Sequence, residues 1–239
     1  MEEKIQVKTK DGCIVYGNLN YKKKNDTLLI FVHGLTGSAR EHQYFNAVPY
    51  FANRGYDIFR FDFYSRKKNG RQLSDCSIST HISDLNLVID KFKDKYKKVV
   101  LIGHSLGALV VLGSKLDNIY KLILWDPTIG LKSLKKKKCV FLPEINKYLL
   151  RWGRETLISE KMVEEWKIAS DLEKLVKKIT KPCKFIFADT HKSSDVWGPY
   201  LKDIKVENDS VIIKGASHIF CEEGIEEKLF SETLSWLEK

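Results

Sequence analysis

Short runs of apolar residues alternate with longer amphipathic stretches along most of the chain. The run at 27–32 is apolar at almost every position, which is typical of a strand buried on both faces of a parallel sheet. Comparable runs predict further strands at 56–61, 98–102, 121–125, 184–188 and 210–213. Near the amino end, Asp11-Gly12 lies between two shorter runs and predicts a β-hairpin.

The amphipathic stretches between these runs have helical spacing. Within 79–96, apolar residues recur at intervals of three and four, and Ser79 or Thr80 can cap the amino end. The same reasoning predicts helices at 41–53, 106–116 and 225–237. Strands that alternate with helices indicate the α/β class, with a mostly parallel sheet flanked by helices on both faces.

One segment interrupts this alternation. Residues 127–181 separate two consecutive predicted strands by about fifty positions, far more than a plain crossover needs. Helical pieces are expected within the segment near 144–151 and 160–178. We interpret it as a lid, inserted after the sixth strand over the carboxyl edge of the sheet, within a single domain that spans residues 1–239.

Composition narrows the classes of protein that fit this pattern. Hydrophobic residues make up 43% of the chain, and no run approaches the roughly 18 apolar residues of a membrane-spanning helix. The amino end is charged and lacks a signal-peptide pattern, so a cytoplasmic protein is expected. The net charge of +10 comes without a nucleic-acid-binding motif, and the five cysteines form no CxxC pair. Neither nucleic acid nor a metal is therefore an expected partner.

A serine follows one of the predicted strands in a glycine-containing turn. Gly103-His104-Ser105-Leu106-Gly107 comes directly after the run at 98–102 and opens a predicted helix. A serine in this position sits on a tight strand-to-helix turn with its hydroxyl exposed. The amino end of the helix also offers free N–H groups to a developing oxyanion. The pattern therefore predicts Ser105 as a nucleophile.

Two backbone N–H groups are expected to hold that oxyanion. The first belongs to Leu106, the residue after the serine. The second comes from the loop after the strand at 27–32, where His33-Gly34-Leu35 makes the N–H of Leu35 the candidate. His33 itself is interpreted as a structural histidine of this loop.

A histidine near the carboxyl end is the candidate general base. A serine hydroxyl needs a base to take its proton, and histidine suits that role near neutral pH. Of the six histidines, only His218 follows the last predicted strand, where the chain order serine, acid, histidine places the base. His191 is the rival, but it lies where the acid is expected.

Three aspartates are candidates for the carboxylate that orients this base. The acid is expected in the loop after the strand at 184–188, which contains Asp189 and Asp195. We favour Asp195, which lies deeper in the loop, over Asp189 at the strand end. The third candidate, Asp126, ends the preceding strand in Trp125-Asp126-Pro127 and is interpreted as a structural residue at the start of the insertion.

These motifs resemble those of the α/β-hydrolase superfamily, in particular the small lidded esterases related to cinnamoyl or feruloyl esterases and monoacylglycerol lipases. The similar segments are the oxyanion loop 33–38, residues 54–62, the turn 103–107, Thr180-Lys181-Pro182 and residues 215–218. The resemblance covers nearly the whole chain. It implies an α/β-hydrolase fold and a Ser-His-Asp triad that needs no metal or cofactor.

Some segments depart from that family's pattern. Residues 64–74 form a longer and more basic loop than the family's RGhGxS segment, and the acid loop has extra residues before Asp195. Within the insertion, the basic run 132–138 precedes the apolar residues 139–143. We interpret this run as a solvated face of the lid, with contact to an anionic acyl substrate as the alternative.

The expected function is hydrolysis of a small-molecule carboxylic ester through an acyl-enzyme intermediate on Ser105. An acyl thioesterase or an acyltransferase would use the same triad, so these activities stay open as alternatives. A non-catalytic binding protein of the same fold is the alternative from another class. It would not need the serine, the histidine and the oxyanion loop together.

Overall fold

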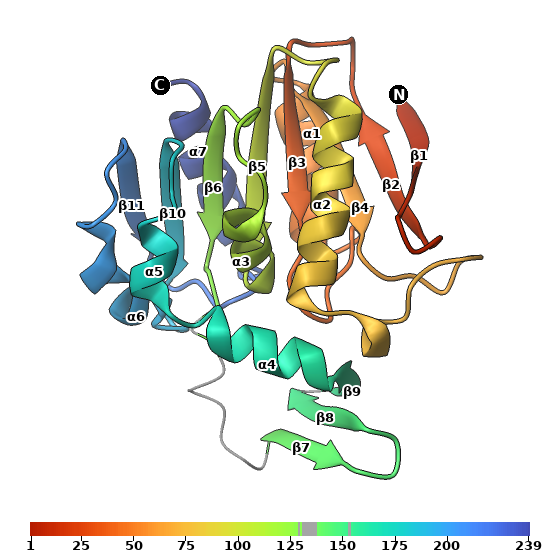
Figure 1. Ribbon diagram of the computed structural model, residues 1–239. Helices are drawn as coiled ribbons and strands as arrows, with labels where there is room; N and C mark the ends of the chain where they lie inside the picture. The colour runs from red at the N-terminus through yellow and green to blue at the C-terminus, as the bar shows by residue number, and fades with distance from the viewer. Residues whose placement is uncertain (129, 131–137, 153) are drawn as a thin grey trace.

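Among the residues that the structure describes (1–128, 130, 138–152 and 154–239), eight strands form the central sheet of this computed structural model. They are β1 (Glu2–Lys8), β2 (Ile14–Asn20), β3 (Thr27–Val32), β4 (Asp57–Asp62), β5 (Lys98–His104), β6 (Lys121–Trp125), β10 (Cys183–Ala188) and β11 (Asn208–Ile213). Their order across the sheet is β1-β2-β4-β3-β5-β6-β10-β11 (Figure 1). β2 is antiparallel to β1 and β4, and the other neighbouring pairs are parallel. The mostly parallel sheet expected from the sequence is confirmed.

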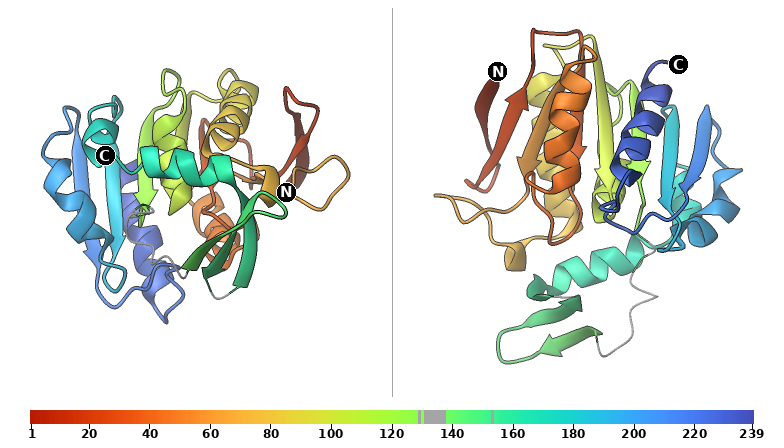
Figure 2. Two further views of the ribbon diagram at one scale, coloured as in Figure 1. Left: turned by 60° about the horizontal axis from the view of Figure 1, so that its bottom comes forward. Right: turned by 180° about the vertical axis from the view of Figure 1, so that it is seen from behind.

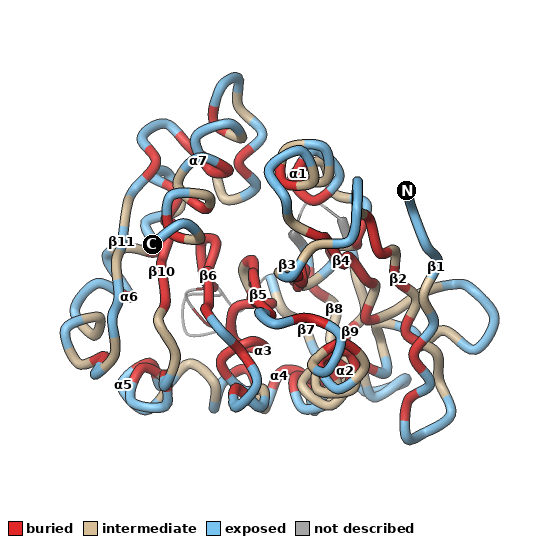
Figure 3. Tube along the Cα trace, turned by 90° about the horizontal axis from the view of Figure 1, so that it is seen from above, coloured by how far each residue is buried: buried red, intermediate tan, exposed pale blue. Residues whose placement is uncertain are grey.

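Helices cover both faces of this sheet, as Figure 3 shows from above. One face carries α1 (His42–Ala52) and α7 (Ile225–Leu237). The other carries α2 (Ile78–Phe92), α3 (Leu106–Gly113), α5 (Leu172–Val176) and α6 (Ser193–Leu201). The four helices predicted outside the insertion are all present, although two of them end three or four residues early.

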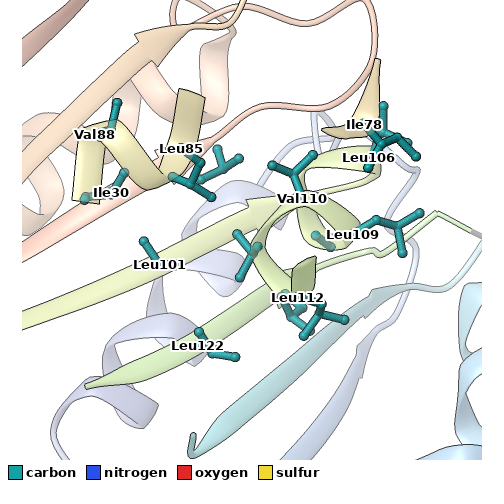
Figure 4. Close-up of a cluster of buried hydrophobic side chains, with 14 of the residues drawn as sticks. Ile30, Ile78, Leu85, Val88, Leu101, Leu106, Leu109, Val110, Leu112 and Leu122 are labelled. Atoms are coloured by element: carbon teal, nitrogen blue, oxygen red, sulfur yellow. The ribbon is translucent and has the colours of Figure 1, made fainter. Parts of the chain in front are cut away.

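The alternation of side chains along the inner strands produces two cores, one on each face. Along β5, Leu101 belongs to the cluster with α2 and α3, whereas its neighbours Val100 and Ile102 pack against the α1 and α7 side. Figure 4 shows Leu101 close to Leu85 of α2 and Val110 of α3. Burying one such side chain stabilises the fold by about 2 kcal/mol. The two cores hold the parallel strands in place, and because these strands run in one direction their carboxyl ends lie along one edge of the sheet.

The insertion after β6 forms a small layer of its own at that edge (Figures 1 and 2). Its described elements are an antiparallel sheet of β7 (Cys139–Leu142), β8 (Lys147–Trp152) and β9 (Arg154–Ser159), followed by α4 (Glu160–Ile168). The prediction of a helix at 144–151 is wrong. A turn in which Asn146 has a φ of 51° leads there into β8. The helix expected at 160–178 is divided where Asp171 caps α5. Residues 132–137 of the basic run lie outside the described chain.

Polar contacts join the second half of the insertion to the start of α2. The Glu165 carboxylate accepts hydrogen bonds from the backbone N and the hydroxyl of Ser79, both at 2.7 Å. Because Ser79 lies in the first turn of α2, the negative charge also meets the positive end of the helix dipole. The Ser159 hydroxyl donates to the Cys76 carbonyl at 2.6 Å.

No helix in the described part of the chain is long and apolar enough to cross a membrane.

Candidate active site

Ser105 lies at the turn between β5 and α3, in a backbone conformation that residues other than glycine rarely adopt. Its φ is 55° and its ψ is −121°. The neighbouring strand holds this conformation, since the Ser105 N–H donates to the Trp125 carbonyl at 3.0 Å and the Ser105 carbonyl accepts from Thr128 N at 3.3 Å. The serine is only partly buried, so its hydroxyl is presented at the edge of the sheet.

A glycine two residues further on lets the turn pack against β3. A Cβ on Gly107 would lie 2.2 Å from the Val32 carbonyl oxygen, a backbone atom that cannot rotate away. Gly107→Ala is therefore expected to destabilise the protein by about 1–3 kcal/mol, measured by urea unfolding. Gly113→Ala, at the other end of α3, is the matched control, because its added Cβ would meet only the end of the Ile82 side chain, which can rotate away. It should cost clearly less than Gly107→Ala, and equal effects of the two substitutions would contradict the packing argument.

His218, in the loop after β11, lies directly beside the serine. Its Nε2 is 2.9 Å from the Ser105 hydroxyl oxygen. The loop is held by His104, whose Nε2 lies 2.7 Å from the His218 carbonyl oxygen. A carbonyl can only accept, so His104 donates this bond. Burial lowers the pKa of His104 to about 3, which keeps this ring neutral. The bond to the His218 carbonyl then places the single ring proton on Nε2.

The carboxylate on the other side of His218 belongs to Asp126. One oxygen, Oδ2, bonds to His218 Nδ1 and lies 2.7 Å from His191 Nδ1. The other oxygen, Oδ1, accepts the Ser193 hydroxyl and the Ala188 backbone N–H, the latter at 3.0 Å. The side chain of Asp126 is fully buried. Burial opposes its ionisation, but the contacts with His191 and His218 outweigh burial and hold the pKa of Asp126 below its ordinary value.

The expected placement of Asp195 or Asp189 beside His218 is therefore corrected. Asp195 is exposed in the first turn of α6, and its backbone N–H donates to the Lys192 carbonyl. Asp189 is exposed as well, and its carboxylate accepts the Gly215 N–H at 3.1 Å. Asp126 occupies the position because β6 lies between β5 and β10, so a residue that follows β6 emerges next to Ser105. Asp126 has a φ of 39°, so it is the second residue with a strained backbone conformation at this edge, after Ser105.

The loop after β3 passes close to Ser105. A Cβ on Gly34 would lie 3.0 Å from the Ser105 Cβ, so only a small residue fits there comfortably. His33 fixes the loop: its Nε2 accepts the Phe63 N–H at 3.1 Å and its Nδ1 lies 2.8 Å from the Gly34 carbonyl oxygen. Burial lowers the pKa of His33, which suits this neutral bridging role. Leu35 follows Gly34 directly, and Leu106 is the first residue of α3, where backbone N–H groups lack helical partners.

Asp126, His191 and His218 are the described residues that together could offer ligands to a metal ion. Their ligand atoms all lie within 4.8 Å of one another. Ligands of a tetrahedral zinc ion, bound at about 2.0–2.2 Å, are roughly 3.3 Å apart. The shared Asp126 oxygen is only 2.7 Å from His191 Nδ1 and is hydrogen-bonded to His218 Nδ1. This spacing suits the sharing of protons better than the binding of a metal.

Comparison with solved structures shows the same fold in several proteins. Est1E from Butyrivibrio proteoclasticus, solved with ferulic acid bound, is 21% identical, with a TM-score of 0.78 over 98% of this chain and 100% of its own. The esterase domain of a Rhodothermus marinus protein is 16% identical, with a TM-score of 0.76 over 99% of this chain and 97% of its own. The α/β hydrolase GrgF from Penicillium sp. sh18 is 16% identical, with a TM-score of 0.79 over 100% and 98%.

The comparison at the level of sequence gives the family. No curated protein matches the sequence. The model of the alpha/beta hydrolase family matches residues 29–220, a span that includes the loop 33–38, Ser105 and His218. The chain therefore belongs to the α/β hydrolase family.

Proposed function

We propose that this protein is a serine hydrolase that cleaves carboxylic esters. The observation that carries the proposal is the continuous line of contacts from Ser105 to His218 to Asp126. The serine oxygen lies 2.9 Å from His218 Nε2, and His218 Nδ1 bonds to a fully buried carboxylate. This is the geometry in which a histidine can take the proton of a serine hydroxyl.

The proposed reaction begins with attack of the Ser105 oxygen on the acyl carbonyl carbon. His218 Nε2 takes the hydroxyl proton as the new C–O bond forms. The resulting oxyanion is held by the backbone N–H groups of Leu35 and Leu106. His218 then gives its proton to the leaving alkoxide as the ester C–O bond breaks. An acyl group remains on Ser105.

Release of the acyl group uses the same residues. His218 takes a proton from a water molecule, whose oxygen attacks the acyl carbonyl, and returns that proton to the Ser105 oxygen as it leaves. Asp126 keeps His218 Nδ1 protonated and balances the positive charge that His218 carries midway through each step. In this proposal neither Asp195 nor Asp189 takes part.

The choice of esters as the substrate class rests on the comparisons. The structural neighbours include an esterase domain and a protein solved with ferulic acid bound. A test is a panel of p-nitrophenyl esters and acyl thioesters of increasing chain length, combined with labelling by a fluorophosphonate probe. Labelling together with faster cleavage of the esters supports the proposal. Faster cleavage of the thioesters would replace the substrate class, and no labelling would oppose a serine nucleophile.

We also propose that residues 127–181 act as a lid that shapes the acyl site. Its described elements β7, β8, β9 and α4 lie at the edge of the sheet where β5 and β6 end, which is the edge that presents Ser105 and Asp126 (Figure 1). Its buried side chains, among them Leu150, Ile158 and Trp166, join the core cluster on the α2 and α3 face. A layer packed in this way can enclose an acyl chain while the triad stays fixed in the sheet below.

The lid proposal predicts a selective effect of its anchor on α2. Removing the charge-assisted bonds of Glu165 to Ser79 in Glu165→Ala should cost about 1–2 kcal/mol of lid attachment. The KM for a long-chain ester is then expected to change several-fold, whereas the KM for an acetyl ester stays the same. Glu164→Ala is the control, since Glu164 is an exposed neighbour on the same helix. Equal changes for long and short esters would contradict the proposed role.

A further inference from the structure

We propose that His191 is a positioning residue, which shares the Asp126 oxygen with His218 and thereby sets the pH range in which His218 acts as a base. This inference rests on the proposed function, since it concerns the same triad. His191 is in the loop that follows β10, whereas Asp126 follows β6 and His218 follows β11. Three loops of the sheet edge therefore bring two histidines to a single carboxylate.

The contacts of His191 separate it from an ordinary loop histidine. Its Nδ1 lies 2.7 Å from Asp126 Oδ2, the same oxygen that bonds to His218 Nδ1. The approach has the distance of a hydrogen bond but not its in-line angle, so we treat it as an electrostatic contact between the ring nitrogen and the carboxylate. The two imidazole rings are also in contact, with centroids 4.1 Å apart and planes tilted by 44°.

A second nitrogen on Oδ2 changes what that oxygen does for His218. Oδ1 is already occupied by Ser193 and Ala188, so the carboxylate cannot turn to give His218 a different oxygen without losing those bonds. His191 draws on part of the negative charge of Oδ2, and that charge is what attracts a proton to His218. Without His191, Oδ2 would act on His218 alone. In that variant His218 is expected to stay protonated up to a higher pH. A protonated His218 cannot serve as a base.

The ionisable groups around His191 come from several elements of the described chain. Asp126 and His218 contact it, and His104 at the end of β5 interacts with it electrostatically. On its own loop, Asp189 turns to Gly215 and Lys192 is exposed. Because one buried carboxylate faces three imidazoles, the site can balance one protonated ring but not two. His191 therefore acts on the same buried charge that balances His218 during the reaction.

The test compares two substitutions of the same residue. His191→Leu removes the ring nitrogen, whereas His191→Asn places an amide N–H where Nδ1 lies and cannot titrate. Rates are measured from pH 5 to 9 on a p-nitrophenyl ester, followed at its isosbestic wavelength. In His191→Leu, the acid limb of kcat/KM should move up by about half to one pH unit and kcat should fall several-fold, with KM little changed. In His191→Asn, the limb should stay close to that of the wild type.

Each other outcome overturns the inference. An acid limb that stays in place in His191→Leu would show that His191 does not act on His218. A limb that moves equally in both variants would show that the N–H at this position is not what matters. Unfolding in urea at pH 8 identifies a variant that has merely lost stability, because such a loss does not move the pH profile.

A second readout is independent of turnover. In protein labelled with ¹⁵N at histidine, the His218 Nδ1 proton is expected far downfield, because it lies in a strong bond to a buried carboxylate. Its resonance should shift in His191→Leu and return toward the wild-type position in His191→Asn. An unchanged resonance in His191→Leu would overturn the inference. Since this measurement needs no substrate, failure of the proposed ester chemistry and failure of the His191 contact give different results.

Discussion

Replacing Ser105 by alanine is expected to lower kcat for an ester substrate by about 10⁶-fold, because the residual rate then depends only on binding and on the oxyanion donors. His218→Ala should cause a loss of similar size, since among the described residues His218 is the base that lies within hydrogen-bond distance of the serine hydroxyl. The two losses should not add in the double variant, because the serine and the histidine act as a unit. The measurement is kcat on a p-nitrophenyl ester with highly purified protein.

The control for this experiment is a serine at the opposite end of the same helix. Ser114 follows α3 and donates its hydroxyl to the Val111 carbonyl at 2.8 Å, at the far end of the helix from Ser105. Ser114→Ala should retain nearly full activity and full labelling by a fluorophosphonate, whereas Ser105→Ala should lose both. Persistent labelling of Ser105→Ala would show that another residue is the nucleophile.

Asp126→Asn is expected to reduce kcat by about 10⁴-fold, the second largest effect. An asparagine keeps the shape of the side chain but cannot balance the positive charge that His218 acquires. It can also present an N–H to His218 Nδ1, which favours the tautomer that leaves Nε2 unable to accept the serine proton. KM should change little, since the buried Asp126 side chain lies behind the histidine rather than on the substrate side.

The two loop aspartates provide the matched comparison. Asp195→Asn and Asp189→Asn should each retain activity within about twofold, as expected for exposed side chains away from the base. The three variants can be made in parallel and compared at the same pH. If Asp195→Asn lost as much activity as predicted for Asp126→Asn, the assignment of the acid made from the geometry would be wrong.

The strands and the long helices could be predicted because their patterns have a direct physical cause. The run at 27–32 has apolar side chains on both faces of the strand, because helices cover the sheet on both sides there. The observed bounds of β3 therefore match the predicted ones. The insertion could not be predicted in the same way. Residues 144–151 are too short and too mixed in character to show a period. The turn at Asn146, with its positive φ, decides the structure there.

The acid shows a different limit of reasoning from sequence. The order serine, acid, histidine along the chain is satisfied by Asp126, Asp189 and Asp195 alike, so the order cannot choose among them. The choice depends on which strands are neighbours in the sheet. β6 lies between β5 and β10, and this arrangement is what brings Asp126 beside Ser105. A signal was present in Trp125-Asp126-Pro127, where an aspartate directly ends a buried strand. His191 stands out in the sequence only as a rival base, and no pattern there predicts its contact with Asp126.

The chain passes from the proposed acid into the proposed lid within two residues, and the join is firmly fixed. Thr128 is buried; its N–H donates to the Ser105 carbonyl at 3.3 Å, and its own carbonyl accepts the Trp197 indole N–H at 3.1 Å. These two bonds attach Thr128 to the Ser105 turn and to α6. We therefore expect this clamp at Thr128 to keep Asp126 in place when the insertion is altered. Loops beyond the clamp could be exchanged or redesigned to admit other acyl groups while the reaction centre keeps its alignment.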